Sequence, residues 1–355
     1  MARTAMLLST CNGLEDVVLH ELQDVVPARA GIEVRPGQVH AWVDAPADVA
    51  VAAAMGLRTV HHVQQVIGEI SLRGAEPLRD LRAAVAGLVI PGLSEAMSFG
   101  VRCRRVGTHE FTSMDAERAA GAGVRDQSPV PVDLDAPALD VRLDIHDARC
   151  LVMVRHSRRS RSRRHEQVVF QKAAAQPAIA AAMVQLLGRE LGGAPQRVLD
   201  PFCGGGTLLL EAGHAWPHAT LLGSDIEPTL SAGTRDNVAD SLHRDIEVRT
   251  GDAGDLVALW GDRAPLDAVL ANPPFGRQLA RGVDLHGLYG RFFAGLEQLL
   301  RPGGLAAVLV WKRRTFVGAM GRGPSLTRVH ARVVEAGGLW VGIEVIRKRT
   351  RHESR

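Results

Sequence analysis

The residues best suited to chemistry form the motif Asn272-Pro273-Pro274-Phe275, directly after the apolar stretch Leu266–Ala271. Each proline fixes φ and lacks a backbone N–H, so the turn presents carbonyl oxygens without competing donors. The Asn272 amide oxygen and the Pro273 carbonyl could accept both hydrogens of a nucleobase amine, a poor nucleophile whose lone pair is delocalised into the ring. Phe275 could stack on a base turned out of its helix. We therefore predict Asn272, Pro273, Pro274 and Phe275 as catalytic residues for transfer onto such an amine.

A glycine-rich turn at residues 201–207 follows a second apolar stretch that ends in Asp200. Glycines allow positive φ and let a ligand approach the backbone. A dinucleotide fingerprint would need a small residue where Leu209 stands, so that interpretation fails. Asp200 could face an ammonium or sulfonium, and the next helix could receive a carboxylate at its N-terminus. S-adenosylmethionine carries all three groups, and we predict that it binds here, at Asp200, Phe202, Cys203, Gly204, Gly206 and Thr207.

Two further carboxylates follow the next predicted strands. Asp225 stands 25 residues after Asp200, where an acidic side chain can accept the hydroxyls of a ribose. Asp252 could accept a hydrogen bond from an adenine amino group. Each aspartate alone could equally cap the following helix, but three at successive strand ends favour a cofactor site. The predicted cofactor-binding residues therefore also include Asp225, Ile226, Asp252 and Ala253.

The elements that must position these residues alternate along the second half of the chain. Short apolar strands precede helical segments, as at residues 208–214, which is the pattern of a parallel sheet covered by crossover helices. N-P-P-F then follows the fourth strand, which favours a site over a merely proline-stiffened turn. The first half mixes strands and helices. Strands are expected at 39–44, 97–105, 141–145 and 150–154, and helices at 48–55, 78–88, 117–123 and 173–187.

Composition bounds the class of protein. The chain has 355 residues, 46% of them hydrophobic and 23% charged, which predicts about two domains with sizeable cores and excludes wholesale disorder. No apolar run approaches 18 residues, so we expect no membrane-spanning helix. The start lacks the pattern of a secretion signal. The four cysteines are widely spaced without a C-x-x-C pair, which favours a reduced, cytoplasmic protein and no metal site.

The charge is unevenly distributed although the net charge is only +3. The balance is −6 over residues 1–154, +6 over 155–172 and +3 over 173–355. Only 3 of the 42 basic residues are lysines, so arginine richness alone does not indicate a nucleic-acid partner. A local basic stripe is the better signal for one. Residues 156–172 could equally be a solvated linker between domains.

These motifs together resemble a known family. The second half resembles class I S-adenosylmethionine-dependent methyltransferases of the N-P-P-F type. The first half resembles the ferredoxin-like plus THUMP pair of RNA methyltransferases, through Gly13-Leu14-Glu15, Leu57-Arg58-Thr59 and the stretch at 104–114. The resemblance implies an α/β fold, with a Rossmann-like methyltransferase sheet after an α+β ferredoxin-like and THUMP module. The implied divisions are 1–65 (ferredoxin-like), 66–155 (THUMP-like), 156–172 (arginine-rich linker) and 173–355 (methyltransferase).

The resemblance also implies a function. The expected reaction is methyl transfer from S-adenosylmethionine to the exocyclic N2 amine of a guanosine in tRNA, in the acceptor-stem region, by a cytoplasmic monomer. Because N-P-P-F does not distinguish the amine attacked, a ribosomal-RNA guanine-N2 or an N6-adenine enzyme stays open. A non-catalytic RNA-binding protein is the alternative from another class. The RNA contacts are expected at Arg102, Arg104, Arg105, His109, Phe111, Arg158, Arg159 and Arg161.

Overall fold

The computed structural model describes residues 2–157, 160, 161, 174–242, 244, 246–275 and 284–350, without the side chains of 30–34. The chain forms two compact units. One comprises Met1–Thr10 and Val18–Arg161, and the other comprises Cys11–Val17 and Ser162–Arg355. Within the described residues, each unit holds a seven-stranded sheet. None of the helices described is both long and apolar enough to cross a bilayer.

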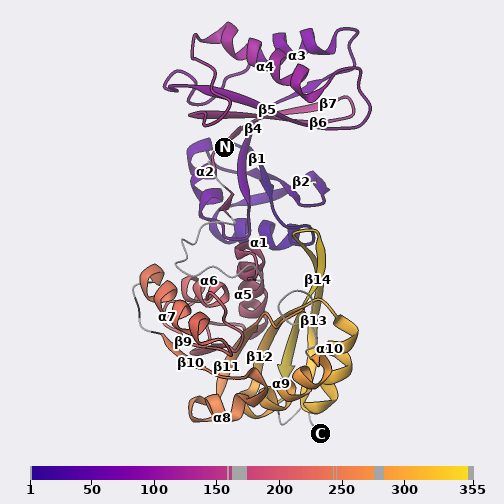
Figure 1. The fold of residues 1–355 in the computed structure, drawn as a ribbon. Helices are drawn as coiled ribbons and strands as arrows, with labels where there is room; N and C mark the ends of the chain where they lie inside the picture. The colour runs from indigo at the N-terminus through magenta and orange to yellow at the C-terminus, as the bar shows by residue number, and fades with distance from the viewer. Residues whose placement is uncertain are drawn as a thin grey trace. The chain divides into compact units, whose positions relative to one another are not determined.

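The sheet of the first unit has the order β2-β3-β1-β4-β7-β6-β5. One apolar core packs α1 and α2 against β1 and β3, and another packs α3 and α4 against β5, β6 and β7 (Figure 1). The predicted boundary between residues 65 and 66 falls inside β4, which pairs with β1 on one side and β7 on the other. The elements are β1 (Thr4–Ser9), α1 (Glu15–Val25), β2 (Ala28–Arg35), β3 (Gln38–Val43), α2 (Ala47–Gly56), β4 (His62–Ser71), α3 (Pro77–Ala86), β5 (Phe99–Val106), α4 (Ser113–Gln127), β6 (Leu139–His146) and β7 (Arg149–Arg155).

Two helices begin at other positions than the sequence pattern predicts, and their first residues explain why. α4 begins at Ser113 because Thr112 forms a capping box with Asp115, which satisfies free N–H groups of the first turn. The helix expected from residue 173 begins at Pro177, as α5 (Pro177–Leu191), because proline suits the first helical position. β2 was not predicted from the sequence.

The sheet of the second unit has the order β10-β9-β8-β11-β12-β14-β13. The first five strands run parallel and β14 runs antiparallel to β12, which confirms the predicted Rossmann-like architecture. Its remaining elements are β8 (Arg197–Asp200), α6 (Thr207–Ala215), β9 (Thr220–Asp225), α7 (Pro228–Leu242), β10 (Glu247–Thr250), η2 (Ala253–Asp255), α8 (Leu256–Trp260), η3 (Gly261–Arg263), β11 (Leu266–Ala271), α9 (Leu285–Leu299), β12 (Leu300–Val310), α10 (Arg313–Ala319), η4 (Met320–Arg322), β13 (Leu326–Ala336) and β14 (Leu339–Lys348).

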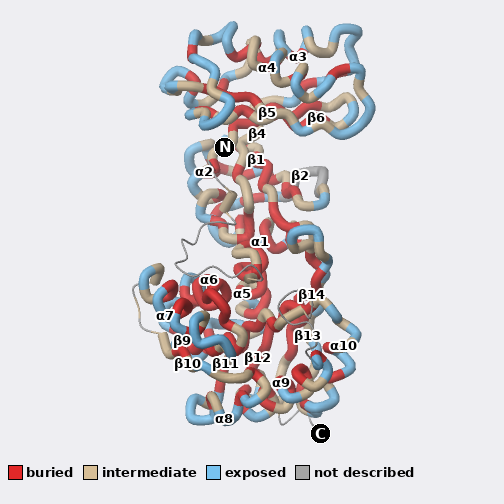
Figure 2. Tube along the Cα trace, viewed as in Figure 1, coloured by how far each residue is buried: buried red, intermediate tan, exposed pale blue. Residues whose placement is uncertain are grey.

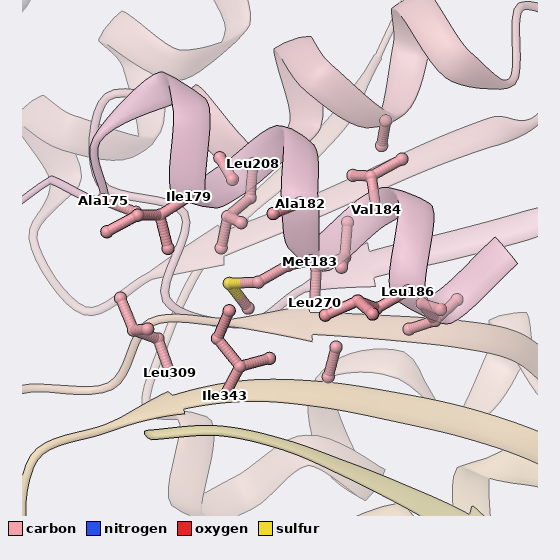
Figure 3. Packing of buried hydrophobic residues seen from close by; sticks show 14 of the residues in the cluster. Ala175, Ile179, Ala182, Met183, Val184, Leu186, Leu208, Leu270, Leu309 and Ile343 are labelled. Carbon is pink, nitrogen blue, oxygen red and sulfur yellow. The ribbon is translucent and has the colours of Figure 1, made fainter. Parts of the chain in front are cut away.

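Successive residues of the central strands enter cores on opposite faces of this sheet. Leu270 of β11 packs with α5 and α6, whereas Val269 packs with α8 and α9. On the first face, Met183 of α5 lies among Leu270 and Ile343 (Figure 3). The tube of Figure 2 is accordingly red through these strands. Burial on both faces is what a parallel sheet covered by helices requires.

Residues 11–17 belong to the second unit although they stand near the start of the chain. Leu14 and Val17 are fully buried in the core that also contains α5. The carbonyl of Asn12 accepts a hydrogen bond from the N–H of Glu335, at 2.9 Å. Gly13 has φ +93°, and a Cβ there would lie 2.3 Å from the carbonyl oxygen of Val333, so only glycine fits. The sequence pattern did not predict this packing.

Candidate functional site

The three predicted carboxylates follow three neighbouring strands. Asp200 ends β8 and Asp225 ends β9, while Asp252 stands two residues beyond β10. Because these strands are adjacent and parallel, their carboxyl ends share one edge of the sheet. Ligands of open α/β sheets bind at that edge. The structure thus places all three aspartates where a nucleoside cofactor would lie.

The glycine-rich turn has the backbone that its residues allow. Gly204 and Gly206 adopt left-handed conformations, with φ of +52° and +84°. The N–H of Gly204 donates to Asp225 Oδ2 at 3.0 Å, so the turn after β8 is tied to the end of β9. The N–H of Gly206 donates to the Cys203 carbonyl at 2.7 Å, just before α6. The left-handed glycines and the Asp225 carboxylate thus help to fix the conformation of the turn.

Two residues that support this turn were not predicted from the sequence. Thr234 and Asn237 of α7 are almost fully buried. The Thr234 hydroxyl donates to the carbonyl of Gly204, and the Asn237 amide donates to that of Gly205 at 2.9 Å. They satisfy buried carbonyls that no regular element pairs. Two polar residues three positions apart on one helical face were the available signal.

Asp200 is the most unusual ionisable group of the site. It is 1% exposed, and its Oδ1 accepts the N–H of Phe202 at 3.0 Å. Burial raises the pKa of Asp200 to about 8, and the nearby charge of Asp225 adds to the rise. A buried carboxylate is stabilised by a cation beside it. This pocket therefore fits the ammonium group of S-adenosylmethionine.

Residues of the glycine-rich turn and Asn272 of the N-P-P-F motif line one small cavity. β11 pairs in parallel with β8, so Asn272 leaves the sheet beside Asp200. Burial also raises the pKa of the Cys203 thiol. Cys203 therefore lines the cavity as an unreactive thiol and does not act as a nucleophile. The lining residues are Ala174, Ala175, Asp200, Phe202, Cys203, Thr207, Leu208 and Asn272.

The residues predicted for the nucleoside end lie in different environments. Asp225 Oδ1 accepts the N–H of Glu227 at 3.0 Å, and the next side chain, Ile226, is 69% exposed. Asp252 caps η2 by accepting the N–H of Gly254 at 2.8 Å, which is the capping role that the sequence left open for it. Ala253 is buried in the apolar core, which leaves only its backbone for a ligand.

The N-P-P-F motif is described as far as Phe275. Asn272 is half-buried, Pro273 is buried, and the half-buried Phe275 packs against the α5-side core. The pair of acceptors predicted for an amine, the Asn272 side chain and the Pro273 carbonyl, therefore belongs to adjacent residues, of which Asn272 lines the cavity. A short turn can bring both to one nitrogen.

The predicted RNA contacts of the first unit differ in availability. Arg102 donates to the carbonyl of Leu134, while Arg104 is exposed. Arg105 Nη1 lies 2.9 Å from His109 Nδ1. Phe111 is 9% exposed and packs in the core under α3 and α4, and its contact with RNA stays a prediction.

The arginine-rich stripe is only partly described. Arg161 Nε donates to the carbonyl of Leu57 at 3.2 Å, which holds that residue to the first unit. Arg158 and Arg159 lie outside the described residues. A contact between these arginines and RNA stays a prediction.

Sheet order, strand-end carboxylates and the N-P-P-F turn define an S-adenosylmethionine-dependent methyltransferase. Comparisons with known proteins agree. The THUMP domain profile matches residues 78–155, and that of the RMKL-like methyltransferase domain matches 164–342. The chain is 35% identical to a tRNA (guanine(6)-N2)-methyltransferase of Thermus thermophilus, over 96% of this chain and 98% of the relative. It therefore belongs to the family of THUMP-containing guanine-N2 methyltransferases.

Other relatives extend the comparison. A tRNA (guanine(10)-N2)-dimethyltransferase of Methanothermobacter thermautotrophicus is 28% identical over 77% of this chain and 78% of its own. The crystal structure of TrmN from Thermus thermophilus superposes with a TM-score of 0.83 and 32% identity, covering 97% of this chain and 99% of that one. The combined THUMP and methyltransferase architecture is thus shared along nearly the whole length.

Proposed function

We propose that this enzyme methylates the exocyclic N2 amine of a guanosine in the acceptor stem of tRNA. The observation that carries the proposal is the cavity at which Asn272 meets Asp200, because it joins an amine-accepting turn to a cation-accepting carboxylate. The relative with 35% identity acts on guanine 6 of tRNA by its name, which supports the acceptor stem.

S-adenosylmethionine, when bound, supplies a methyl group made electrophilic by its sulfonium. Asp200 would hold the ammonium end, the turn at Gly204 and Gly206 would let the ligand approach the backbone, and Asp225 would accept the ribose hydroxyls. Asp252 would accept from the adenine amino group, with Ile226 packing on the ring. The exposure of Ile226 supports that last role.

The catalytic turn acts on the amine. Asn272 and the Pro273 carbonyl would accept its two N–H groups, which directs the nitrogen lone pair away from the guanine ring. Phe275 would stack on the extruded base, and Pro274 would keep the backbone fixed. Positioning and preorganised dipoles supply the rate enhancement in such a site.

Several finer assignments belong to the same proposal. The residues 66–155 form the THUMP part, and Arg104 and Arg105 contact RNA from it. The enzyme acts as a monomer in the cytoplasm. The described cysteines, all without disulfides, support a reducing compartment.

The test is identification of the product nucleoside. Purified enzyme and labelled S-adenosylmethionine are incubated with total tRNA and, separately, with ribosomal RNA, and the nucleosides are analysed by mass spectrometry. We expect N2-methylguanosine in tRNA, mapped to position 6 by nuclease digestion. Label in position 10, in ribosomal RNA or in N6-methyladenosine would contradict the proposed substrate, and no label in any RNA would contradict enzymatic activity.

A further inference from the structure

The turn between β12 and α10 leaves the sheet beside the catalytic motif. β11 and β12 are parallel neighbours with Ala271 opposite Val308. Pro274 and Trp311 therefore each stand three residues beyond this pair, at the same edge of the sheet. Trp311 and Phe275 are both half-buried against the same apolar core. The turn after β12 and the N-P-P-F motif therefore lie at the same edge of the sheet.

The turn carries three consecutive cations, Lys312, Arg313 and Arg314. Lys312 and Arg314 are exposed. Neither forms an ion pair with a carboxylate among the residues that the structure describes. Cations in the first turn of a helix are unfavourable to it, so the stability of α10 does not explain them.

Arg313 has a different role from its neighbours, because it is anchored beneath the turn. Its Nε lies 2.5 Å from Oε1 of Glu344, a fully buried carboxylate of β14. Arg328 of β13 lies 3.5 Å from the other oxygen. The side chain crosses Gly342, where a Cβ would lie 2.8 Å from its Cδ. Gly342 and Glu344 thus hold Arg313 in place. Its two neighbours, Lys312 and Arg314, stay exposed.

The ammonium of Lys312 is also oriented. It lies 5.6 Å from the ring centroid of Trp311, within the range of a cation–π contact. Such a contact restricts a flexible side chain without neutralising its charge. Lys312 is one of only three lysines in a chain with 39 arginines, so a general bias of composition does not account for it.

We propose that Lys312 and Arg314 bind the phosphates beside the target nucleotide, on a turn that Arg313 and Glu344 hold in place. The inference rests on the proposed function, since it needs an RNA substrate at the N-P-P-F turn. Two cations beside the N-P-P-F turn would hold the RNA strand in a fixed position while the target base is extruded. Phosphate contacts position a nucleic acid without reading its sequence.

The test uses the full-length enzyme with a tRNA transcript. Lys312→Ala, Arg314→Ala and the double variant are compared with wild type for tRNA KM and kcat, for tRNA binding by fluorescence anisotropy at several salt concentrations, and for S-adenosylmethionine affinity. The double variant should weaken tRNA binding about tenfold and reduce the slope of log affinity against log salt by roughly 0.7–0.9 per lost phosphate contact. Its S-adenosylmethionine affinity should stay within twofold of wild type.

Two controls sharpen the result. Lys312→Arg keeps the charge and should retain most of the tRNA affinity. Lys348→Ala removes a lysine whose ammonium donates to the Leu300 carbonyl at the opposite end of β12, and it should leave the salt slope unchanged. An unchanged slope in the double variant, or an equal loss in Lys348→Ala, would overturn the phosphate contacts. A wild-type enzyme that methylates no tRNA would instead refute the proposed function.

Discussion

Arg332 of β13 binds both carboxylate oxygens of Asp16, a residue 316 positions earlier in the chain, with Nη2 at 2.7 Å from Oδ2. Arg332 also donates to the Gly13 carbonyl at 2.9 Å. The pair lowers the pKa of Asp16, because the guanidinium stabilises its ionised form. With the buried Leu14 and Val17, it fastens residues 11–17 onto the methyltransferase unit.

This packing predicts that Leu14 stabilises the catalytic unit. Leu14→Ala should lower the free energy of unfolding by about 2–5 kcal/mol, the usual cost of emptying a buried leucine site. Asp16→Ala should cost less than about 1 kcal/mol, since its carboxylate is half exposed. Denaturant unfolding measures both. Val25→Ala, at the exposed end of α1, is the control, and an equal loss there would contradict the packing role.

Replacement of Asn272 should separate catalysis from cofactor binding. Asn272→Ala removes one of the two acceptors for the amine, so methyl transfer should fall by at least about a hundredfold, the scale of losing one preorganised polar contact at the reacting atoms. S-adenosylmethionine affinity should change little, and calorimetry would show this. Turnover at the wild-type rate would contradict the assignment of Asn272 as an acceptor for the amine.

The pKa of Asp200 makes folding stability depend on pH. Because the pKa is about 8 in the folded, cofactor-free protein and near 3.8 when unfolded, the folded state binds more protons between these values. Stability contributed by the protonated carboxyl is therefore lost as pH rises through this window, by at most about 1.4 kcal/mol per pH unit. Relative to wild type, Asp200→Asn should gain stability from pH 5 to pH 8 in denaturant titrations. Parallel curves for the two proteins would exclude this titration.

Cofactor binding should release a proton from the same group. The ammonium of S-adenosylmethionine beside Asp200 favours the carboxylate, so at pH 7 the wild-type protein should lose protons on binding. Calorimetry in buffers of different ionisation enthalpy measures the number released. We expect a smaller release, together with weaker binding, in Asp200→Asn. Identical proton release in the variant would place the cation elsewhere.

Removal of the α7 hydrogen bonds should disturb the glycine-rich turn. Asn237→Ala leaves the Gly205 carbonyl buried without its donor, which costs about 1–3 kcal/mol. S-adenosylmethionine affinity should fall by roughly tenfold, whereas tRNA binding in the absence of cofactor should not change. Asp240→Ala on the same helix is the comparison variant, since Asp240 is exposed and no change is expected. Wild-type S-adenosylmethionine affinity in Asn237→Ala would show that the glycine-rich turn keeps its conformation without this hydrogen bond.

Local signals predicted where several candidate site residues lie. Asp200 and Asp225 end apolar strands and Asn272 follows one, so their positions at one sheet edge follow from strand order. Thr234 and Asn237 share one face of a helix, but this spacing alone does not show that they are buried or that they bind the carbonyls of the glycine-rich turn. Phe111 raises a similar ambiguity: an aromatic ring beside arginines suits either RNA or a core, and in the structure this ring packs in a core.

Long-range packing was also beyond the sequence pattern. Leu14 and Val17 stand at helical spacing around the start of α1, but the spacing does not say which unit covers their side chains. β4 spans residues on both sides of an expected boundary, because its pairing with β1 and β7 is set by strands far along the chain. Such contacts depend on topology rather than on neighbouring residues.

The placement of residues 11–17 has a consequence for biosynthesis. Leu14 leaves the ribosome long before β13 and β14, against whose residues it packs. The methyltransferase core can therefore close only after nearly the whole chain has been translated. Until then, the apolar side chains of residues 11–17 lack the partners that bury them in the folded protein. Contacts so distant in sequence slow folding and lengthen the exposure of apolar surface.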